Sequence, residues 1–141
     1  MNTNPTSDTA TGQPQHTPVD LTSAYQTFTQ TWSPRIVAQV DGYDVKIAKV
    51  EGQYVWHAHE DTDEFFMVIA GEFTVELEGR DPVVLGPQQV FTVPRGTKHR
   101  PSGTPGTRIL FMERRDTLNS GDADLSNDPW VPLTKGVALN G

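Results

Sequence analysis

The sequence predicts an all-β domain of the sandwich or barrel class, preceded by one short helix. From Arg35 onward, short runs alternate between apolar and polar side chains with a period of two. Glycines and prolines, which number 12 and 11 in 141 residues, mark turns between these runs. Short strands at regular spacing with turn residues between them are typical of antiparallel sandwiches and barrels.

The ends of the chain are predicted to be less ordered than its middle. The predicted organisation is a flexible tail at 1–19, a domain at 20–122 and an irregular tail at 123–141. The first tail is mainly Thr, Pro, Gln and Asn, and has almost no apolar surface to offset the entropy lost on ordering. In the second tail, Trp130, Val131 and Leu133 are the residues expected to contact the body or a partner chain.

The predicted domain opens with a helix. Asp20 stands at a position that suits an N-cap. One apolar face with the spacing i, i+3, i+4, i+7 is made of Leu21, Ala24, Tyr25 and Phe28. We therefore predict one short helix packed on the body of the domain.

At least eight strands are predicted after this helix. Their residues are 35–40, 43–50, 53–59, 64–71, 72–79, 82–85, 88–94 and 107–113. The first two flank Asp41–Gly42, a dipeptide typical of a two-residue hairpin turn. In the run 64–71 both odd and even positions are apolar, so this strand is predicted to be buried on both faces. In 72–79 apolar and polar residues alternate, so one face is predicted to be exposed to solvent.

Composition narrows the classes of function. The net charge is −7 and there is no basic run, so neither a nucleic acid nor an anionic membrane is an expected partner. The chain has no cysteine, which excludes disulfides, thiolate metal sites and a cysteine nucleophile. Its beginning lacks the basic and apolar pattern of a signal peptide, and no apolar stretch reaches membrane-spanning length. We therefore expect a cytoplasmic protein.

Two histidines lie one residue apart in the predicted strand 53–59. Alternate side chains of a strand point the same way, so His57 and His59 would share a face with Val55. The opposite face would carry Tyr54, Trp56 and Ala58. Two imidazoles on one face can bind one metal ion, and neutral imidazole suits Zn, Fe, Ni and Cu.

Glu64 follows the acidic stretch "EDTD" at 60–63. Its odd offset from His59 would turn it outward on a continuous strand, so a turn at 60–63 must reset the parity. Glu60, Asp61 and Asp63 are expected to face water. With Glu64 inward, Phe66 and Val68 would share its face. An apolar substrate pocket is therefore predicted, lined by Val55, Phe66 and Val68.

A third histidine, His99, comes after the turn residues Pro94 and Gly96. It is predicted to begin the next strand, near the same end of the barrel as the first two. The predicted domain contains three histidines, and a single site could use all of them.

Two stretches resemble the two motifs of the cupin family. Residues 52–71 are similar to the first motif, and its H-x-H, Glu and Gly positions match His57, His59, Glu64 and Gly71. Residues 86–99 are similar to the second motif, and its P-x-G-x-x-H core matches Pro94, Gly96 and His99. Loop lengths differ from the family's pattern in both motifs, and Gly103 stands where the family often has Asn. The resemblance covers about residues 33–122, and includes the late run "LNSGD".

The resemblance implies a double-stranded β-helix, the jelly-roll barrel of cupins, with one divalent transition metal per chain. The implied ligands are His57, His59, Glu64 and His99, and the implied metals are Mn, Fe, Ni or Zn. Four protein ligands close a tetrahedral Zn site, which is then usually structural. Six-coordinate Mn, Fe or Ni would keep about two positions open for a substrate.

The resemblance also implies a class of function, but it identifies no catalytic residue. We expect a metal-dependent enzyme that acts on a small organic molecule, with dioxygenase chemistry favoured over decarboxylase, isomerase or lyase chemistry. A non-catalytic module that binds a ligand or metal, and a metal-free cupin that modifies sugars, are the alternatives. Cupins commonly pair through apolar outer faces, so a homodimer is expected.

Overall fold

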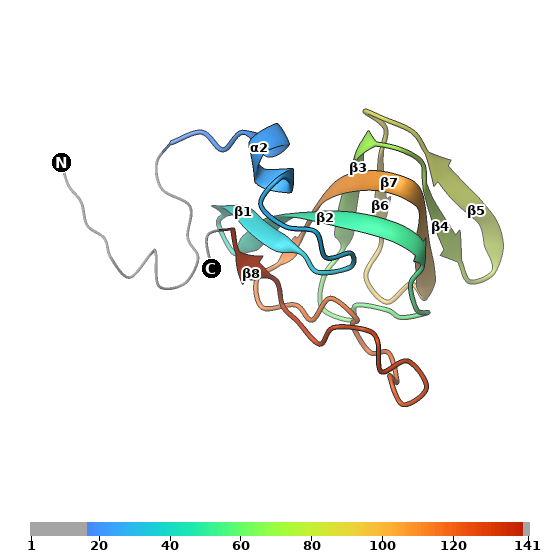
Figure 1. Cartoon of the computed structure of the whole chain (residues 1–141). Helices are drawn as coiled ribbons and strands as arrows, with labels where there is room; N and C mark the ends of the chain where they lie inside the picture. The colour runs from blue at the N-terminus through green and yellow to red at the C-terminus, as the bar shows by residue number, and fades with distance from the viewer. Residues whose placement is uncertain (1–16, 140–141) are drawn as a thin grey trace.

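A computed structural model describes residues 17–139 (Figure 1). Most of the predicted flexible tail lies outside the described residues, and 17–19 are exposed with no regular structure. The elements are α2 (Leu21–Tyr25), β1 (Arg35–Val40), β2 (Tyr43–Gln53), β3 (Glu64–Ala70), β4 (Phe73–Leu77), β5 (Arg80–Leu85), β6 (Val90–Val93), β7 (His99–Arg114) and β8 (Val137–Ala138). Within these residues the chain is an all-β jelly roll with one short helix, as predicted.

The long strand β7 organises the sheet. The order β5-β4-β7-β2-β1-β8 runs across it, and β3 pairs with both β6 and β7. Residues 99–103 of β7 pair with β4, and residues 108–112 pair with β3, while β2 runs beside 102–114. Because the neighbour of β7 changes midway, the sheet rolls around an interior (Figure 1).

The interior of the roll holds the larger of two core clusters. Apolar side chains from β2, β3, β4 and β7 meet there with Trp32 and Tyr54. The Phe66 ring lies 5.0 Å from that of Phe73 and 5.9 Å from that of Phe111. On β3 the inward side chains are buried and the outward ones half-buried, so the predicted burial of both faces holds only in part.

Helix α2 covers the outer face of β2. The side chain of Asp20 accepts a hydrogen bond from the Ser23 amide at 2.9 Å, which confirms it as the N-cap. The smaller core cluster under the helix contains Ala24, Tyr25, Phe28, Val37 and Ile47. The Tyr25 hydroxyl donates to the Ile109 carbonyl of β7 at 2.5 Å. Because of this cover, β2 is buried on both faces through its middle.

The predicted strand 53–59 is wrong. Strand β2 ends at Gln53, after Gly52 with its φ of +74°, and the chain then continues without a ladder to β3. His57 and His99 form an isolated bridge, and the Tyr54 amide bonds to the Pro101 carbonyl at 2.9 Å. Proline has no amide hydrogen to return, so Pro101 limits pairing of this segment with β7.

The segment after β7 runs back across the roll to β1. Strand β8 pairs parallel with β1, from Val137 opposite Arg35. Of the three residues expected to contact the body, Val131 is buried in the main core, while Trp130 is 51% and Leu133 is 72% exposed. Trp130 still places its ring edge-on to Tyr54, with 6.1 Å between the ring centroids.

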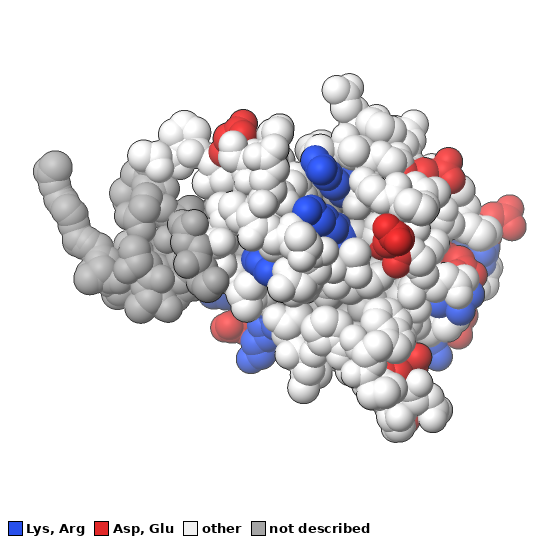
Figure 2. Space-filling model, viewed as in Figure 1, with Lys and Arg blue, Asp and Glu red and all other residues white. Residues whose placement is uncertain are grey.

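The surface carries mixed charge. On the face that Figure 2 shows, Lys and Arg are scattered among Asp and Glu without one continuous basic patch. No helix within residues 17–139 is long and apolar enough to cross a membrane.

Candidate metal centre

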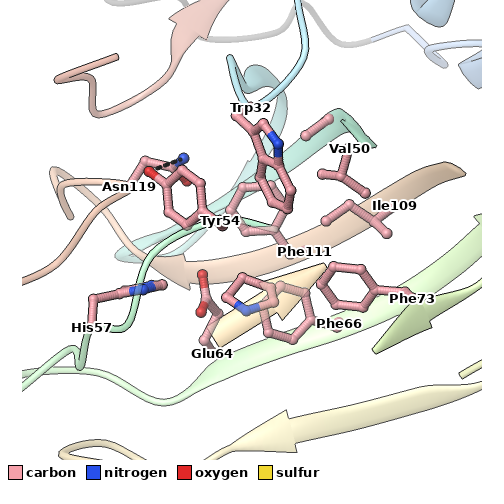
Figure 3. Close-up of a pocket in the computed structure, with 12 residues that line it drawn as sticks. Trp32, Val50, Tyr54, His57, Glu64, Phe66, Phe73, Ile109, Phe111 and Asn119 are labelled. Atoms are coloured by element: carbon pink, nitrogen blue, oxygen red, sulfur yellow. Dashed lines mark hydrogen bonds between the residues drawn. The ribbon is translucent and has the colours of Figure 1, made fainter. Parts of the chain in front are cut away.

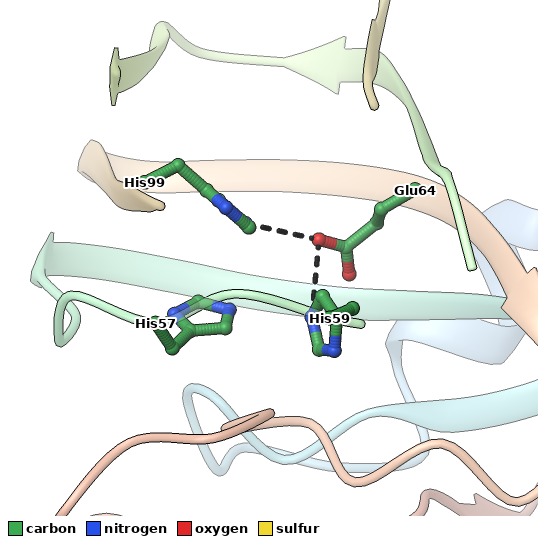
Figure 4. A group of neighbouring side chains, drawn as sticks. All are labelled: His57, His59, Glu64 and His99. Atoms are coloured by element: carbon green, nitrogen blue, oxygen red, sulfur yellow. Dashed lines mark hydrogen bonds and ion pairs between the residues drawn. The ribbon is translucent and has the colours of Figure 1, made fainter. Parts of the chain in front are cut away.

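Four buried side chains meet at one end of the interior (Figure 4). His57 and His59 come from the segment between β2 and β3, while Glu64 and His99 are the first residues of β3 and β7. One nitrogen or oxygen atom from each lies within 4.8 Å of the others. Each residue is 5% exposed or less. These are the four residues that the resemblance to cupins implied as metal ligands.

The H-x-H segment is not held by strand pairing. A turn of the C-terminal segment holds it instead. The Ala58 amide donates to the Asp122 carboxylate at 2.7 Å, and the Asp122 amide donates to the Ala58 carbonyl at 3.1 Å. Gly121 packs so closely that a Cβ there would collide with the Ala58 carbonyl oxygen and lie 3.1 Å from the His57 ring. The backbone around Ala58 is therefore fixed from both sides, with a histidine before and after it.

The acidic stretch 60–63 makes the bend that the parity of Glu64 requires. The chain bends at Glu60 and Asp61, which are exposed together with Asp63. Thr62 is buried, and its hydroxyl accepts from the Arg114 amide at 3.0 Å and donates to the Asp63 carbonyl at 2.7 Å. This anchor on the end of β7 starts β3 with Glu64 pointing inward.

Backbone carbonyls orient two of the three imidazoles. His57 Nδ1 lies 2.9 Å from the Val55 carbonyl, and His99 Nδ1 lies 2.8 Å from that of Thr97. A carbonyl oxygen only accepts, so Nδ1 carries the hydrogen in both rings and Nε2 of the neutral ring is free to bind an ion. Metal-binding histidines are commonly held in this way through the ring nitrogen that faces away from the metal.

The third imidazole, His59, is buried without a hydrogen-bond partner on either ring nitrogen among the described residues. Its Nε2 lies 3.4 Å from Glu64 Oε1, which is itself 3.2 Å from His99 Nε2 (Figure 4). Buried polar atoms are nearly always partnered, and an ion between these groups would supply the missing partner. The donors therefore fit a divalent transition metal, with three imidazole nitrogens and one carboxylate.

The charge states also suit a cation. Burial and the neighbouring His99 lower the pKa of His57 to about 4, which keeps this ring neutral. Burial alone would raise the pKa of Glu64, but His59 and His99 outweigh it, and the pKa lies well below its usual value. Burial acts to lower the pKa of His99, but its hydrogen bond to Glu64 raises it overall. The cluster thus presents an ionised carboxylate beside imidazole nitrogens.

Sequence reasoning missed a second pair of charges beside the four. Lys46 of β2 and Glu113 of β7 are fully buried, and Lys46 Nζ donates to Glu113 Oε2 at 2.9 Å. Glu113 Oε1 lies 3.7 Å from His59 Nε2. Burial and the nearby Glu64 carboxylate raise the pKa of Glu113 well above its usual value, and Lys46 opposes this only in part.

An apolar cavity and a polar cavity border the cluster, and different residues of the cluster line each of them. His57 and Glu64 line an apolar cavity of about 20 Å³, with the aromatic rings of Trp32, Tyr54 and Phe66 around it (Figure 3). This volume holds about one water molecule. His59 lines a polar cavity of about 440 Å³ on the side of the C-terminal segment.

The predicted pocket wall is placed only in part by the structure. Phe66 lines the apolar cavity, whereas Val55 and Val68 are buried in the core without lining it. Tyr54 was expected to point away from the histidines, but its ring lies edge-on to His57 at 5.5 Å. The cause is the missing strand at 53–59, which removes the strict alternation of side chains. Asn119, which donates to the Tyr54 hydroxyl at 3.1 Å, also lines this cavity and was not predicted.

Comparisons of sequence and structure point to one family. The family model Cupin_2, described as Cupin domain, matches residues 43–112. The uncharacterized protein YdbB of Bacillus subtilis (strain 168) is 32% identical over 79 residues, which are 56% of this chain and 70% of that protein.

Solved structures agree. A cupin-2 domain containing protein from Shewanella frigidimarina NCIMB 400 has a TM-score of 0.66 and 33% identity, over 69% of this chain and 94% of that one. Protein NMB1881 from Neisseria meningitidis shares the fold at a TM-score of 0.64 and 21% identity, over 70% and 99% of the two chains. KdgF from Halomonas sp. has a TM-score of 0.51 and 26% identity, over 57% and 77%.

Proposed function

This chain belongs to the cupin superfamily, and from that premise we propose that it is a mononuclear metal-dependent enzyme acting on a small organic molecule. The observation that carries the proposal is the compact group His57, His59, Glu64 and His99, with Nε2 of two rings freed by carbonyl bonds to Nδ1. When bound there, a divalent ion would supply Lewis acidity toward an oxygen of the substrate.

The protein's own residues would orient the substrate and restrict water. The aromatic wall of the apolar cavity excludes bulk water beside His57 and Glu64. The polar cavity offers the Arg114, Arg115 and Lys135 side chains, together with several carboxylates, on the side of His59. A small polar molecule could therefore approach from that side while the apolar side stays dry.

The native metal and its coordination are the first test. We expect elemental analysis of protein purified without added metal to find about one divalent transition metal per chain. The cobalt form should show the weak visible absorption of five or six ligands. Protein with no bound transition metal, and with no uptake of added cobalt, would contradict the proposal.

Dioxygenase chemistry is the reaction class that we favour for this enzyme. Its support is the dry aromatic cavity next to Glu64, because dioxygen is small and apolar. The test is turnover of an enolisable or aromatic substrate under air and under nitrogen. Full turnover without oxygen would exclude this class and leave decarboxylase, isomerase or lyase chemistry.

A non-catalytic binding module is the second candidate. The small volume of the apolar cavity, about 20 Å³, favours it, because no organic substrate fits there in this conformation. This candidate predicts a tetrahedral ion with four protein ligands and no open position. X-ray absorption spectra of the native metal form would distinguish it from the enzyme.

We also propose a homodimer. Val84 of β5 and Val90 of β6 are 56% and 53% exposed, and both lie on strands at an edge of the sheet. Exposed edge strands with apolar side chains favour pairing with another chain. Light scattering at several protein concentrations measures the mass, and a monomer at all of them would contradict the proposal.

A further inference from the structure

The Lys46–Glu113 pair is the buried charge that the proposed metal site does not use. Both side chains are fully buried, and Lys46 Nζ lies 2.9 Å from Glu113 Oε2 and 3.5 Å from the Thr117 carbonyl. Removing two charges from water costs more than the pair regains unless further hydrogen bonds complete it. Stability alone therefore gives a poor account of this pair.

One atom of the pair is left without a partner. Glu113 Oε1 makes no hydrogen bond to any described residue, although it is buried. The other oxygen is held by Lys46, and the two residues stand on adjacent, directly paired strands, β2 and β7. Lys46 therefore holds Oε2, and Oε1 is the oxygen left on the side of His59.

The free oxygen faces the metal centre. It lies 3.7 Å from His59 Nε2, a separation close to the 3.4 Å between that nitrogen and Glu64 Oε1. Yet Glu113 is not one of the four residues whose donor atoms lie within 4.8 Å of one another. It stands beside the coordinating group, at a position where it could contact a ligand of the ion.

The pair also lies behind the wall of the polar cavity. His59, which Glu113 faces, and Thr117, whose carbonyl Lys46 approaches, both line that cavity. The cavity carries Arg114, Arg115 and Lys135, and also Glu60, Asp61, Asp116 and Asp122. Glu113 itself lines neither cavity, and its Oε1 faces the same His59 nitrogen from the interior side.

We propose that Glu113 is a ligand-binding residue of the metal centre, which accepts a hydrogen bond from a hydroxyl or enol group of the bound substrate. Lys46 is its positioning residue. The substrate class is therefore a small molecule with such a group next to a metal-binding carboxylate or carbonyl oxygen. This assignment rests on the proposed function, because it requires an ion at the four ligands.

The test compares two probes on the cobalt-loaded protein. Glycolate carries a carboxylate and a hydroxyl, and methoxyacetate carries the same carboxylate with an ether oxygen that cannot donate. The dissociation constants are measured from the visible absorption of cobalt. Wild-type protein should bind glycolate more tightly, and Glu113→Gln should reduce this preference about tenfold or more. The amide has a single acceptor oxygen, which the Lys46 ammonium group takes, so the NH2 group that then faces the site cannot accept a hydrogen bond.

Three further variants make the result specific. Lys46→Met should also reduce the preference, because Glu113 loses its anchor. Glu113→Gln combined with Lys46→Met removes both charges at similar volume, so it should stay folded and show the same loss. The exposed Glu78→Gln is the matched control, and it should keep the wild-type preference.

Each outcome is decisive. An equal preference in wild type and Glu113→Gln, or no preference in cobalt-loaded wild type, overturns the assignment while the proposed function stands. Loss of cobalt from Glu113→Gln also overturns it, because Glu113 would then be a ligand of the metal. Wild-type protein that binds no cobalt overturns the proposed function and this assignment with it.

Discussion

The interior of the jelly roll has two halves that differ in chemistry although the same strands build both. On β7, the inward side chains Ile109 and Phe111 are followed by Glu113. On β2, Val50 and Ala48 lie inward in the apolar half, and Lys46 lies inward in the polar half. The pleat is the same in both halves, and only the side chains change along it.

This difference separates stability from function within one interior. The apolar half gains free energy from packed rings, such as Phe66 against Phe73. The polar half buries three imidazoles, three carboxylates and an ammonium group, which costs free energy unless each is partnered. Changes in the first half should therefore act on folding, and changes in the second should act on binding.

The largest effect is expected from Phe73→Ala. Phe73 is fully buried among aromatic rings, so its removal should lower the free energy of unfolding by about 3–5 kcal/mol. Urea unfolding of the metal-free protein measures this free energy. Val84→Ala, at an exposed position, is the control, and its free energy of unfolding should stay within about 0.5 kcal/mol of wild type. A loss below about 1 kcal/mol for Phe73→Ala would break the comparison.

His59→Ala tests the polar half. Removing a residue that only supports a metal ligand commonly lowers metal affinity about 10–100-fold. We expect His59→Ala to lose more than this, because it removes a ligand itself. The fold should remain, since the imidazole makes no hydrogen bond to the described residues. Metal content and circular dichroism check both points. Asp61→Ala, in the exposed bend beside it, should keep its metal, and unchanged metal in His59→Ala would disprove the site.

Gly121→Ala should affect both properties, because the turn at 118–122 connects the two halves to the C-terminal segment. Its φ is +54°, and an added Cβ would collide with the Ala58 carbonyl. We expect a loss of about 1–3 kcal/mol in stability and weaker metal binding. Thermal unfolding and cobalt titration measure them. Gly106→Ala, also at positive φ but with open space around it, separates backbone strain from the collision.

Acidification should weaken metal binding, because protons compete with the ion for the ligand atoms. The raised pKa of His99 means that the ion must displace a proton there, so affinity falls as the pH drops through that pKa. His57, with its pKa of about 4, holds no proton to displace near neutral pH. Cobalt affinity should fall about tenfold per pH unit in this range. Affinity that stays constant between about pH 5.5 and 8 would contradict this account.

The four residues of the centre could be predicted because they match the two cupin motifs, and for Glu64 strand parity also required a bend before it. Glu64 and His99 each begin a strand, and the bend at 60–63 turns Glu64 inward as its offset required. The predicted strand at 53–59 failed for a reason that is not local. Whether an extended segment forms a ladder depends on its partner, and here that partner is Pro101.

The buried pair could not be predicted from alternation alone. In β2 the pattern separates Val45 and Ile47 from Lys46, but it does not say which set faces the interior. A lysine is expected in water, yet α2 covers Val45 and Ile47 from outside and leaves Lys46 within. Glu113 did carry a signal, since it shares the parity of Ile109 and Phe111 at the end of an apolar run.

The bracing of Ala58 by Asp122 has a consequence for biosynthesis. At about 5–20 residues per second, several seconds pass between synthesis of the H-x-H segment and synthesis of the turn that holds it. In the nascent chain, His57 and His59 are therefore synthesised well before the residues that fix the backbone between them. The geometry of the H-x-H segment is complete only when this late turn docks against Ala58.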